Sequence, residues 1–187
     1  MKYTPDSTLE LILNKYATAD KEVVCTQAPG TFFNAIWPDL WQASTSYAVG
    51  DLVHPPTTNG CIYECTVAGT SGSTEPGWQT TQDATFTDGG VTWKTHLNYS
   101  IAQTDLVSSD FTIADGDTDG RKLTVARKEN VTSHESGDIN HTALLNTANQ
   151  ELLLVTEAVT TIGGSNHIDS GRTVIFFEYD ITVRDPS

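Results

Sequence analysis

The residues best suited to metal chemistry form an acidic run, ADGDTDGR, in the second half of the chain. Asp115, Asp117 and Asp119 alternate before Gly120, as oxygen ligands do in the first half of a calcium-binding loop. The bidentate glutamate that completes such a loop is missing, because Ala126 occupies its position. The run therefore has two interpretations: a calcium site on the three aspartates, or a tight turn between two strands in which glycine supplies a positive φ.

Aromatic residues are the second set of candidates, because all four tryptophans fall between Trp37 and Trp93. Indole and phenol rings stack on the apolar faces of sugars, and their polar tips bond hydroxyl groups. Trp93 alternates with Val91 on one face of a predicted strand, so we expect Trp93 and Trp41 in a small core. Trp78 follows a turn-rich loop, and we take Trp78 and Tyr63 as the candidate glycan-binding pair.

The chain carries no recognisable catalytic motif. It has no GxSxG sequence and no phosphate-binding loop, and no cysteine has a histidine partner nearby. The three cysteines do not suggest a disulfide framework, because Cys61 and Cys65 would lie about 13 Å apart on one strand. We expect buried free thiols at Cys25, Cys61 and Cys65, and a protein that is not an enzyme and has no cofactor unless calcium binds.

The charge balance narrows the range of partners. The net charge of −14 repels phosphates, so nucleic acid is not an expected partner. No run approaches the roughly 20 apolar residues of a transmembrane helix, so a membrane is not an expected partner either. The beginning, MKYTPDSTLELIL, contains acidic residues within a short apolar run and is not typical of a signal peptide. We therefore expect the protein to begin in a cytoplasm.

The elements that must position these residues are mostly strands. A helix is predicted over residues 6–18, with Asp6 as N-cap and one face formed by Leu9, Ile12, Leu13 and Tyr16. The other regular elements are strands, predicted at 22–26, 111–114, 122–128, 142–146, 152–159 and 173–183.

Residues 40–97 differ in character, being rich in Thr and Gly and poor in charge. Short strand patterns recur there between turn sequences such as PPTTNG and DGG, which is typical of a small all-β module. The first 39 residues are too few to fold alone, so we pair 1–39 with 98–187 in one discontinuous domain. The predicted fold is mainly β: a β-sandwich-like domain with one N-terminal helix, and an inserted module at 40–97.

The middle region resembles a module of tailed-phage virion proteins that is similar to the chitin-binding type 3 carbohydrate-binding domains. The matching residues are WQASTSYAVGDLVHPPTTNGCIYECTVAGTSGSTEPGW and TDGGVTW. The adjacent tryptophan pair that serves the chitin binders as a sugar platform is missing after Trp78. Only Trp78 is carried over from the resemblance as a sugar contact.

The flanking regions resemble a recurring family of minor phage virion structural proteins. The similarity is in ATADKEVVCTQ, DFTIADGDTDGRKLTVARKENV, HTALLNTANQELLLVTEA and the closing ITVRDPS. It implies a discontinuous domain that carries a guest module.

From the two resemblances we expect a bacteriophage virion structural protein assembled in the host cytoplasm, most simply a capsid decoration protein. Its expected partners are the major capsid protein or other virion proteins, further copies of itself and a host surface glycan. Two alternatives stay open: a tail or neck fibre or adaptor, and a chitin- or glycan-binding accessory protein outside the virion.

Overall fold

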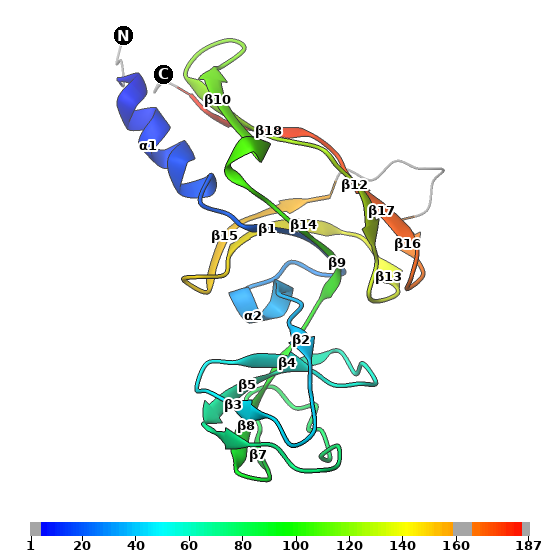
Figure 1. The fold of residues 1–187 in the computed structure, drawn as a ribbon. Helices are drawn as coiled ribbons and strands as arrows, with labels where there is room; N and C mark the ends of the chain where they lie inside the picture. Colours follow the sequence, from blue (N-terminus) through cyan, green and yellow to red (C-terminus); the bar gives the residue numbers. More distant parts are fainter. Residues whose placement is uncertain (1–4, 159–165, 185–187) are drawn as a thin grey trace. The chain divides into compact units, whose positions relative to one another are not determined.

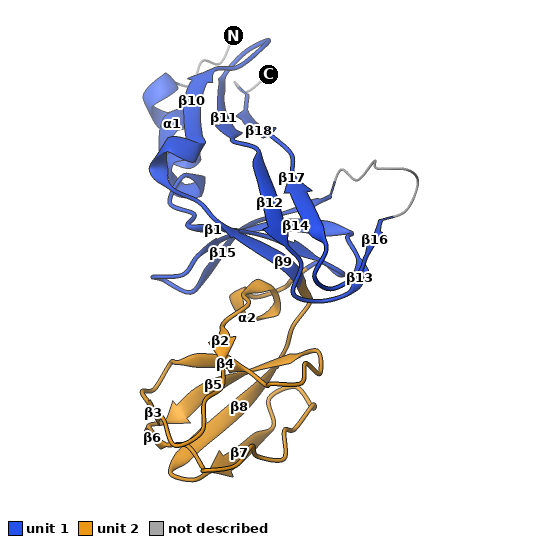
Figure 2. Ribbon diagram, turned by 45° about the vertical axis from the view of Figure 1, so that its right-hand side comes forward, with its two compact units in different colours: residues 1–28, 101–187 blue, residues 29–100 orange. Residues whose placement is uncertain are grey.

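The computed structural model describes residues 5–158 and 166–184. The chain forms two compact units (Figure 2): unit 1 comprises residues 1–28 and 101–187, and unit 2 comprises residues 29–100. The sequence-based boundaries at 40 and 97 fall inside unit 2, which also takes in the preceding loop and a short helix. Both units are built mainly from strands, which confirms the predicted mainly β fold, and most of the strands pair antiparallel.

Unit 1 opens with helix α1, Asp6–Tyr16, which covers most of the predicted range (Figure 1). Leu9 and Leu13 are buried, whereas Ile12, predicted on the same face, is largely exposed. The predicted N-cap is wrong. Pro5 occupies that position without a side-chain hydrogen bond, and Asp6 is the first helical residue, where its charge favours the positive end of the helix dipole.

The central sheet of unit 1 has the order β15-β14-β1-β9. Its strands are β1 (Lys21–Cys25), β9 (Ser100–Asp105), β14 (His141–Asn146) and β15 (Glu151–Glu157). In the antiparallel register of β1 and β14, Glu22 lies opposite Leu144. Val159, the last residue of the strand predicted at 152–159, lies outside the described residues.

Smaller sheets complete unit 1 (Figure 1). One has the order β10-β11-β18, and two are strand pairs, β12-β17 and β13-β16. Their bounds are Phe111–Asp115 for β10, Arg121–Val125 for β11, Lys128–Thr132 for β12, Gly137–Asp138 for β13, His167–Ile168 for β16, Thr173–Phe176 for β17 and Tyr179–Val183 for β18. A 3-10 turn, η1 (Ser108–Asp110), precedes β10.

The predictions of continuous strands at 173–183 and 122–128 are both wrong, because each segment is interrupted in the structure. The first divides into β17 and β18, and the second ends with β11 just before β12 begins. β17 pairs with β12 while β18 pairs with β11, so both chain segments leave one sheet and join another at matching positions. The alternating pattern continues across the break and does not reveal it.

Unit 2 contains a five-stranded sheet of order β2-β4-β5-β8-β7 and a small pair, β3-β6. The strands are β2 (Asp39–Leu40), β3 (Ser46–Tyr47), β4 (Leu52–His54), β5 (Cys61–Val67), β6 (Gly69–Thr70), β7 (Thr85–Asp88) and β8 (Val91–Leu97). A single-turn helix, α2 (Phe32–Ala35), stands before them. All three cysteines of the chain are free and buried, which confirms the prediction of buried free thiols.

The two ends of unit 2 are tied to each other. The backbone N–H of Tyr99 donates to the carbonyl oxygen of Asn34 at 2.8 Å. The amide of Asn98 donates to the carbonyl oxygens of Phe33 and Ile36, at 2.9 and 2.8 Å. The incoming and outgoing segments of the module therefore lie side by side.

Candidate binding sites

The predicted core role of Trp41 and Trp93 is confirmed, because both rings are buried in unit 2. Both indole N–H groups donate to Oδ2 of Asp88, at 2.9 Å from Trp41 and 3.2 Å from Trp93. The other oxygen, Oδ1, accepts the backbone N–H of Gly72 at 2.8 Å. Asp88 thus satisfies the polar tips of two large core rings, and none of these groups faces a ligand.

The candidate glycan pair lies beside this core. Tyr63 is 0% exposed, and its hydroxyl donates to the carbonyl oxygen of Gln79 at 2.9 Å and accepts from the amide of Asn59 at 2.8 Å. Burial raises the pKa of Tyr63 to about 12. The ring of Trp78 is partly buried, with its centroid 4.4 Å from that of Tyr63, and its N–H donates to Glu75 at 2.7 Å.

This geometry gives Tyr63 a packing role. A ring that is 0% exposed presents no face on which a sugar can stack. Trp78 is left as a single, partly exposed ring. One such ring does not form the flat platform of two adjacent tryptophans that the resemblance implies for sugar binders.

The acidic run lies in the turn between β10 and β11, and Gly120 has a φ of 70°. Asp115 forms an ion pair with Arg121, and Asp117 with Lys122 at 2.8 Å. These cations occupy carboxylates that a calcium ion would need. Over residues 5–158 and 166–184, no group of three or more His, Cys, Asp or Glu side chains is arranged to hold a metal ion. The arrangement is that of a tight acidic turn stabilised by strand cations.

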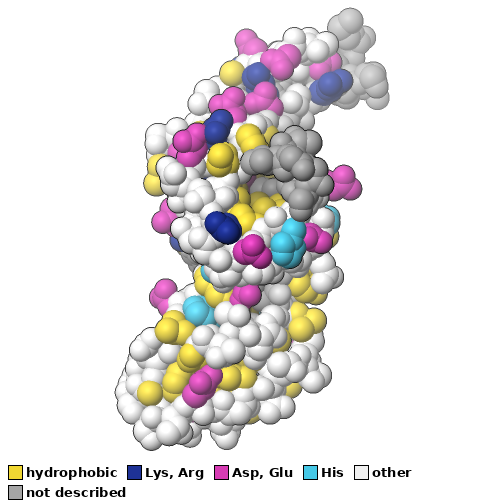
Figure 3. All heavy atoms as spheres, turned by 90° about the vertical axis from the view of Figure 1, so that its right-hand side faces the viewer, with side chains coloured by type: hydrophobic (Ala, Val, Ile, Leu, Met, Phe, Trp, Pro, Cys, Tyr) yellow, Lys and Arg dark blue, Asp and Glu magenta, His cyan; other side chains and the backbone are white. Residues whose placement is uncertain are grey.

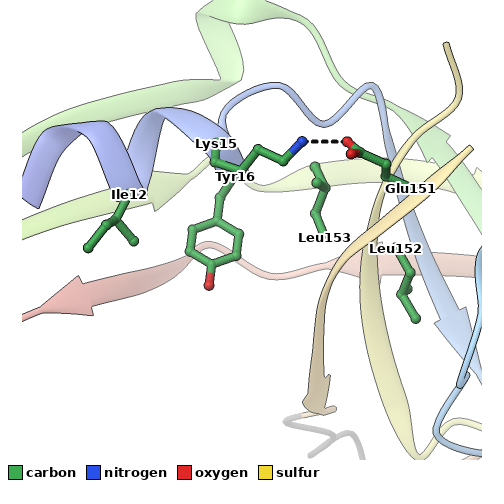
Figure 4. Close-up of a pocket in the computed structure, with 6 residues that line it drawn as sticks. All are labelled: Ile12, Lys15, Tyr16, Glu151, Leu152 and Leu153. Atoms are coloured by element: carbon green, nitrogen blue, oxygen red, sulfur yellow. Dashed lines mark hydrogen bonds and ion pairs between the residues drawn. The ribbon is translucent and has the colours of Figure 1, made fainter. Parts of the chain in front are cut away.

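An apolar surface on α1 was not identified from the sequence as a site. Leu11 is 72% exposed and Ile12 is 46% exposed. Figure 4 shows Ile12 and Tyr16 beside Leu153, with the ion pair between Lys15 and Glu151 at one edge. These residues and Leu152 line a hollow of about 490 Å³ between α1 and β15. We call Leu11 and this hollow the α1 surface.

A larger cavity, about 710 Å³, opens in unit 1 beside β1, β17 and β18. Glu22 lines it, although this side chain is only 1% exposed. Burial is the main cause that raises the pKa of Glu22 to about 8, against an opposing effect of the Lys128 charge. The only sequence signal was a single acidic residue alternating with Val24 in the apolar strand KEVVC.

No helix in the described part of the chain is both long enough and apolar enough to cross a membrane. No protein-family model matches the chain, and neither a curated protein nor a solved structure shows significant similarity to it.

Proposed function

We propose that this chain is a structural protein of a bacteriophage particle that decorates the capsid and acts by binding, without catalysis. The observation that carries the proposal is the paired ends of unit 2, where Tyr99 bonds to Asn34 and Asn98 to the turn beside it. A module with adjoining ends can be inserted into a loop of a host domain without disturbing it. Together with the two phage resemblances, this favours an assembly domain, unit 1, that carries a guest, unit 2.

The α1 surface is the proposed attachment site on unit 1. Leu11 and Ile12 expose apolar area that a soluble surface helix normally covers with polar residues. Burying such a surface against the major capsid protein would supply the hydrophobic part of the contact. The net charge of −14 would complement a basic patch on the lattice, and the symmetry of the lattice would array the copies.

Host glycan binding by unit 2 is left out of the proposed function. Tyr63 is buried, and Trp78 packs on it and bonds to Glu75, so the two candidate residues do not form an open platform. Unit 2 in this proposal is a displayed module whose aromatic residues maintain its own fold.

The first experiment measures the copy number of the protein in purified virions by quantitative mass spectrometry, relative to the major capsid protein. A ratio near one, or a simple fraction of it, is expected for a protein bound across the lattice. A ratio of about a few per cent would assign it instead to the neck or tail, following the symmetry of those sites. Absence from the particle would refute the virion role and favour the accessory-protein alternative.

The second experiment tests the attachment site with matched variants. Leu11→Asp places a charge on the α1 surface, whereas Val49→Asp makes the same kind of change at an exposed position of unit 2. We expect particles that lack the protein to bind the added wild type and the Val49 variant, but not the Leu11 variant. Equal binding of both variants would show that attachment uses another surface.

A further inference from the structure

The 710 Å³ cavity of unit 1 has the size and walls of a small-molecule site. Organic ligands occupy cavities of roughly 300–1,000 Å³ that are mostly apolar with a few polar groups. Apolar residues form much of this wall, among them Val24, Ile139, Ile168, Val174 and Phe176. Figure 3 shows the side of the molecule that carries β16 and β17, where hydrophobic atoms lie in a hollow with acidic, histidine and Lys or Arg side chains around it.

Two polar atoms in this wall have no hydrogen-bond partner in the described structure. They are Oε2 of Glu22 and the hydroxyl oxygen of Tyr179, and both are fully buried. The two side chains interact, and a weak Tyr179–Glu22 hydrogen bond contributes to the pKa shift of each, but Oε2 of Glu22 and the Tyr179 hydroxyl lie outside strict hydrogen-bond geometry. A buried, unpaired polar group destabilises the fold, so a bound polar group that pairs with it would recover free energy.

The charges around the cavity select the kind of polar group. Its acidic lining residues are Glu22, Glu157, Glu178 and Asp180, and neither lysine nor arginine is among its described lining residues. Asp180 already accepts from Lys122 at 3.1 Å. Lys128 acts on Glu22 from outside the lining, but its charge is compensated by Asp110 at 2.6 Å. The cavity therefore favours a cation over an anion.

We propose that this cavity binds an amphipathic organic amine, with the apolar body against β17 and the ammonium group at Glu22 and Tyr179. An ammonium has three donors and no acceptor, and both unpartnered oxygens can accept. The bond to Glu22 is charge-assisted, while Tyr179 contributes a neutral one. Nothing in the proposal depends on attachment to a capsid.

Binding should depend on pH, because the ammonium requires the ionised form of Glu22. Without ligand the pKa of Glu22 is about 8, so below that pH a proton must leave the carboxyl as the amine binds. The amine affinity should therefore rise with pH, about tenfold per unit, until it levels off near the pKa.

Several other charged or titratable groups act around the head of the ligand. Lys128 on β12, Asp110 in η1 and Tyr179 on β18 are those that affect Glu22. Glu157, Glu178, Asp180 and His167, which forms an ion pair with Asp138, line the cavity. Substituting a carboxylate of unit 1 outside the cavity is therefore the control for a general electrostatic effect.

The experiment uses the full-length chain and three probes with the same body: phenylbutylamine, phenylbutanol and phenylbutyrate. Calorimetric titrations measure the affinity of each probe at about pH 6.5, where Glu22 is mostly protonated, and at about pH 8.5, where it is mostly ionised. We expect the amine to bind best and to gain on the order of tenfold or more in affinity between the two pH values. Equal or tighter binding of the alcohol or the acid, or a flat pH profile, would overturn the proposal.

Two variants assign the site. Glu22→Gln keeps the shape of the neutral carboxyl, so the fold should persist, but amine affinity at the higher pH should fall about tenfold or more, and its pH dependence should disappear. The control Glu129→Gln, at an exposed carboxylate of unit 1 that does not line the cavity, should change affinity about twofold or less. Equal losses in both variants would show that bulk charge, not Glu22, attracts the amine.

Tyr179→Phe provides a second test that does not depend on the Glu22 variant remaining folded. It removes only the hydroxyl and should weaken the amine several-fold at both pH values. Unchanged amine binding in this variant would remove Tyr179 from the site and contradict the proposed position of the head group.

Discussion

Units 1 and 2 each bury a carboxyl group, and the two groups differ in how their oxygens are partnered. Asp88 of unit 2 is 5% exposed and accepts three N–H groups, two of them from the core indoles. Glu22 of unit 1 is 1% exposed, and its Oε2 has no partner in the described structure. Burial disfavours both charges equally in principle, so the difference lies in how each site compensates for it.

The comparison separates a structural acid from one available for binding. The donors around Asp88 satisfy both of its oxygens and join β7 to β8 and to the segments that follow β2 and β6. Around Glu22 the larger effect is desolvation, which raises its pKa and keeps a proton on it at neutral pH. A buried acid with one oxygen left without a hydrogen-bond partner, next to a cavity, is a site where a ligand can supply what the fold does not.

The largest expected loss of stability is in unit 2. Asp88→Ala leaves two buried indole N–H groups and the backbone N–H of Gly72 without acceptors, and should lower the free energy of unfolding of unit 2 by on the order of 3 kcal/mol. All four tryptophans belong to residues 37–93, so tryptophan fluorescence during urea denaturation reports this unit alone.

The control for Asp88→Ala is Asp83→Asn, at an exposed aspartate that pairs with Lys94 at 2.9 Å. Asparagine also tolerates the positive φ of 63° at this position. A control transition that shifts as far as that of the Asp88 variant would mean that the buried acceptor is not what stabilises the core.

An effect of opposite sign, a gain in stability, is expected in unit 1. The pKa of Glu22 is about 8 in the folded chain, against an ordinary value of 4.5. Between these values the unfolded chain loses the proton and the folded chain keeps it, so stability is full below about pH 4.5 and falls as the pH rises to about 8. Glu22→Gln removes that loss, and above about pH 8 it should stabilise unit 1 by on the order of a few kcal/mol.

The measurement for Glu22→Gln is amide hydrogen exchange of β1 and β14, comparing variant and wild type at the same pH. Protection should differ at alkaline pH and converge near pH 4.5, the ordinary value for this carboxyl. Parallel curves at all pH values would contradict the raised pKa and would weaken the proposed amine site, whatever the role of the protein in a particle.

Much of the strand content could be predicted because alternation and turn residues are local signals. A strand that carries both Cys61 and Cys65 was predicted and is β5, Cys61–Val67, and the core position of Trp93 follows from its alternation with Val91. The break between β17 and β18 was not predictable, because it depends on which distant strands each half pairs with.

The candidate sites were less predictable than the strands, since partners decide them. The sequence pattern suggests Asp115 and Asp117 as calcium ligands, but in the structure they pair with Arg121 and Lys122. Glu22 is a single letter in a strand, and its significance depends on residues more than 80 positions away, Asp110, Lys128 and Tyr179. Long-range contacts of this kind leave no periodic pattern in a sequence.

The smallest expected effect concerns the other buried phenol, Tyr63, which unlike Tyr179 has partners for its hydroxyl. Tyr63→Phe removes the bonds to Gln79 and Asn59 and should lower the stability of unit 2 by about 1 kcal/mol, measured by the same fluorescence transition. The ring stays, so its packing on Trp78 should persist. Binding of a chitin oligosaccharide, if any is measured for the wild type, should not change, because the hydroxyl is sealed inside the core. A variant of unchanged stability that loses sugar binding would contradict this assignment and would return Tyr63 to a glycan site.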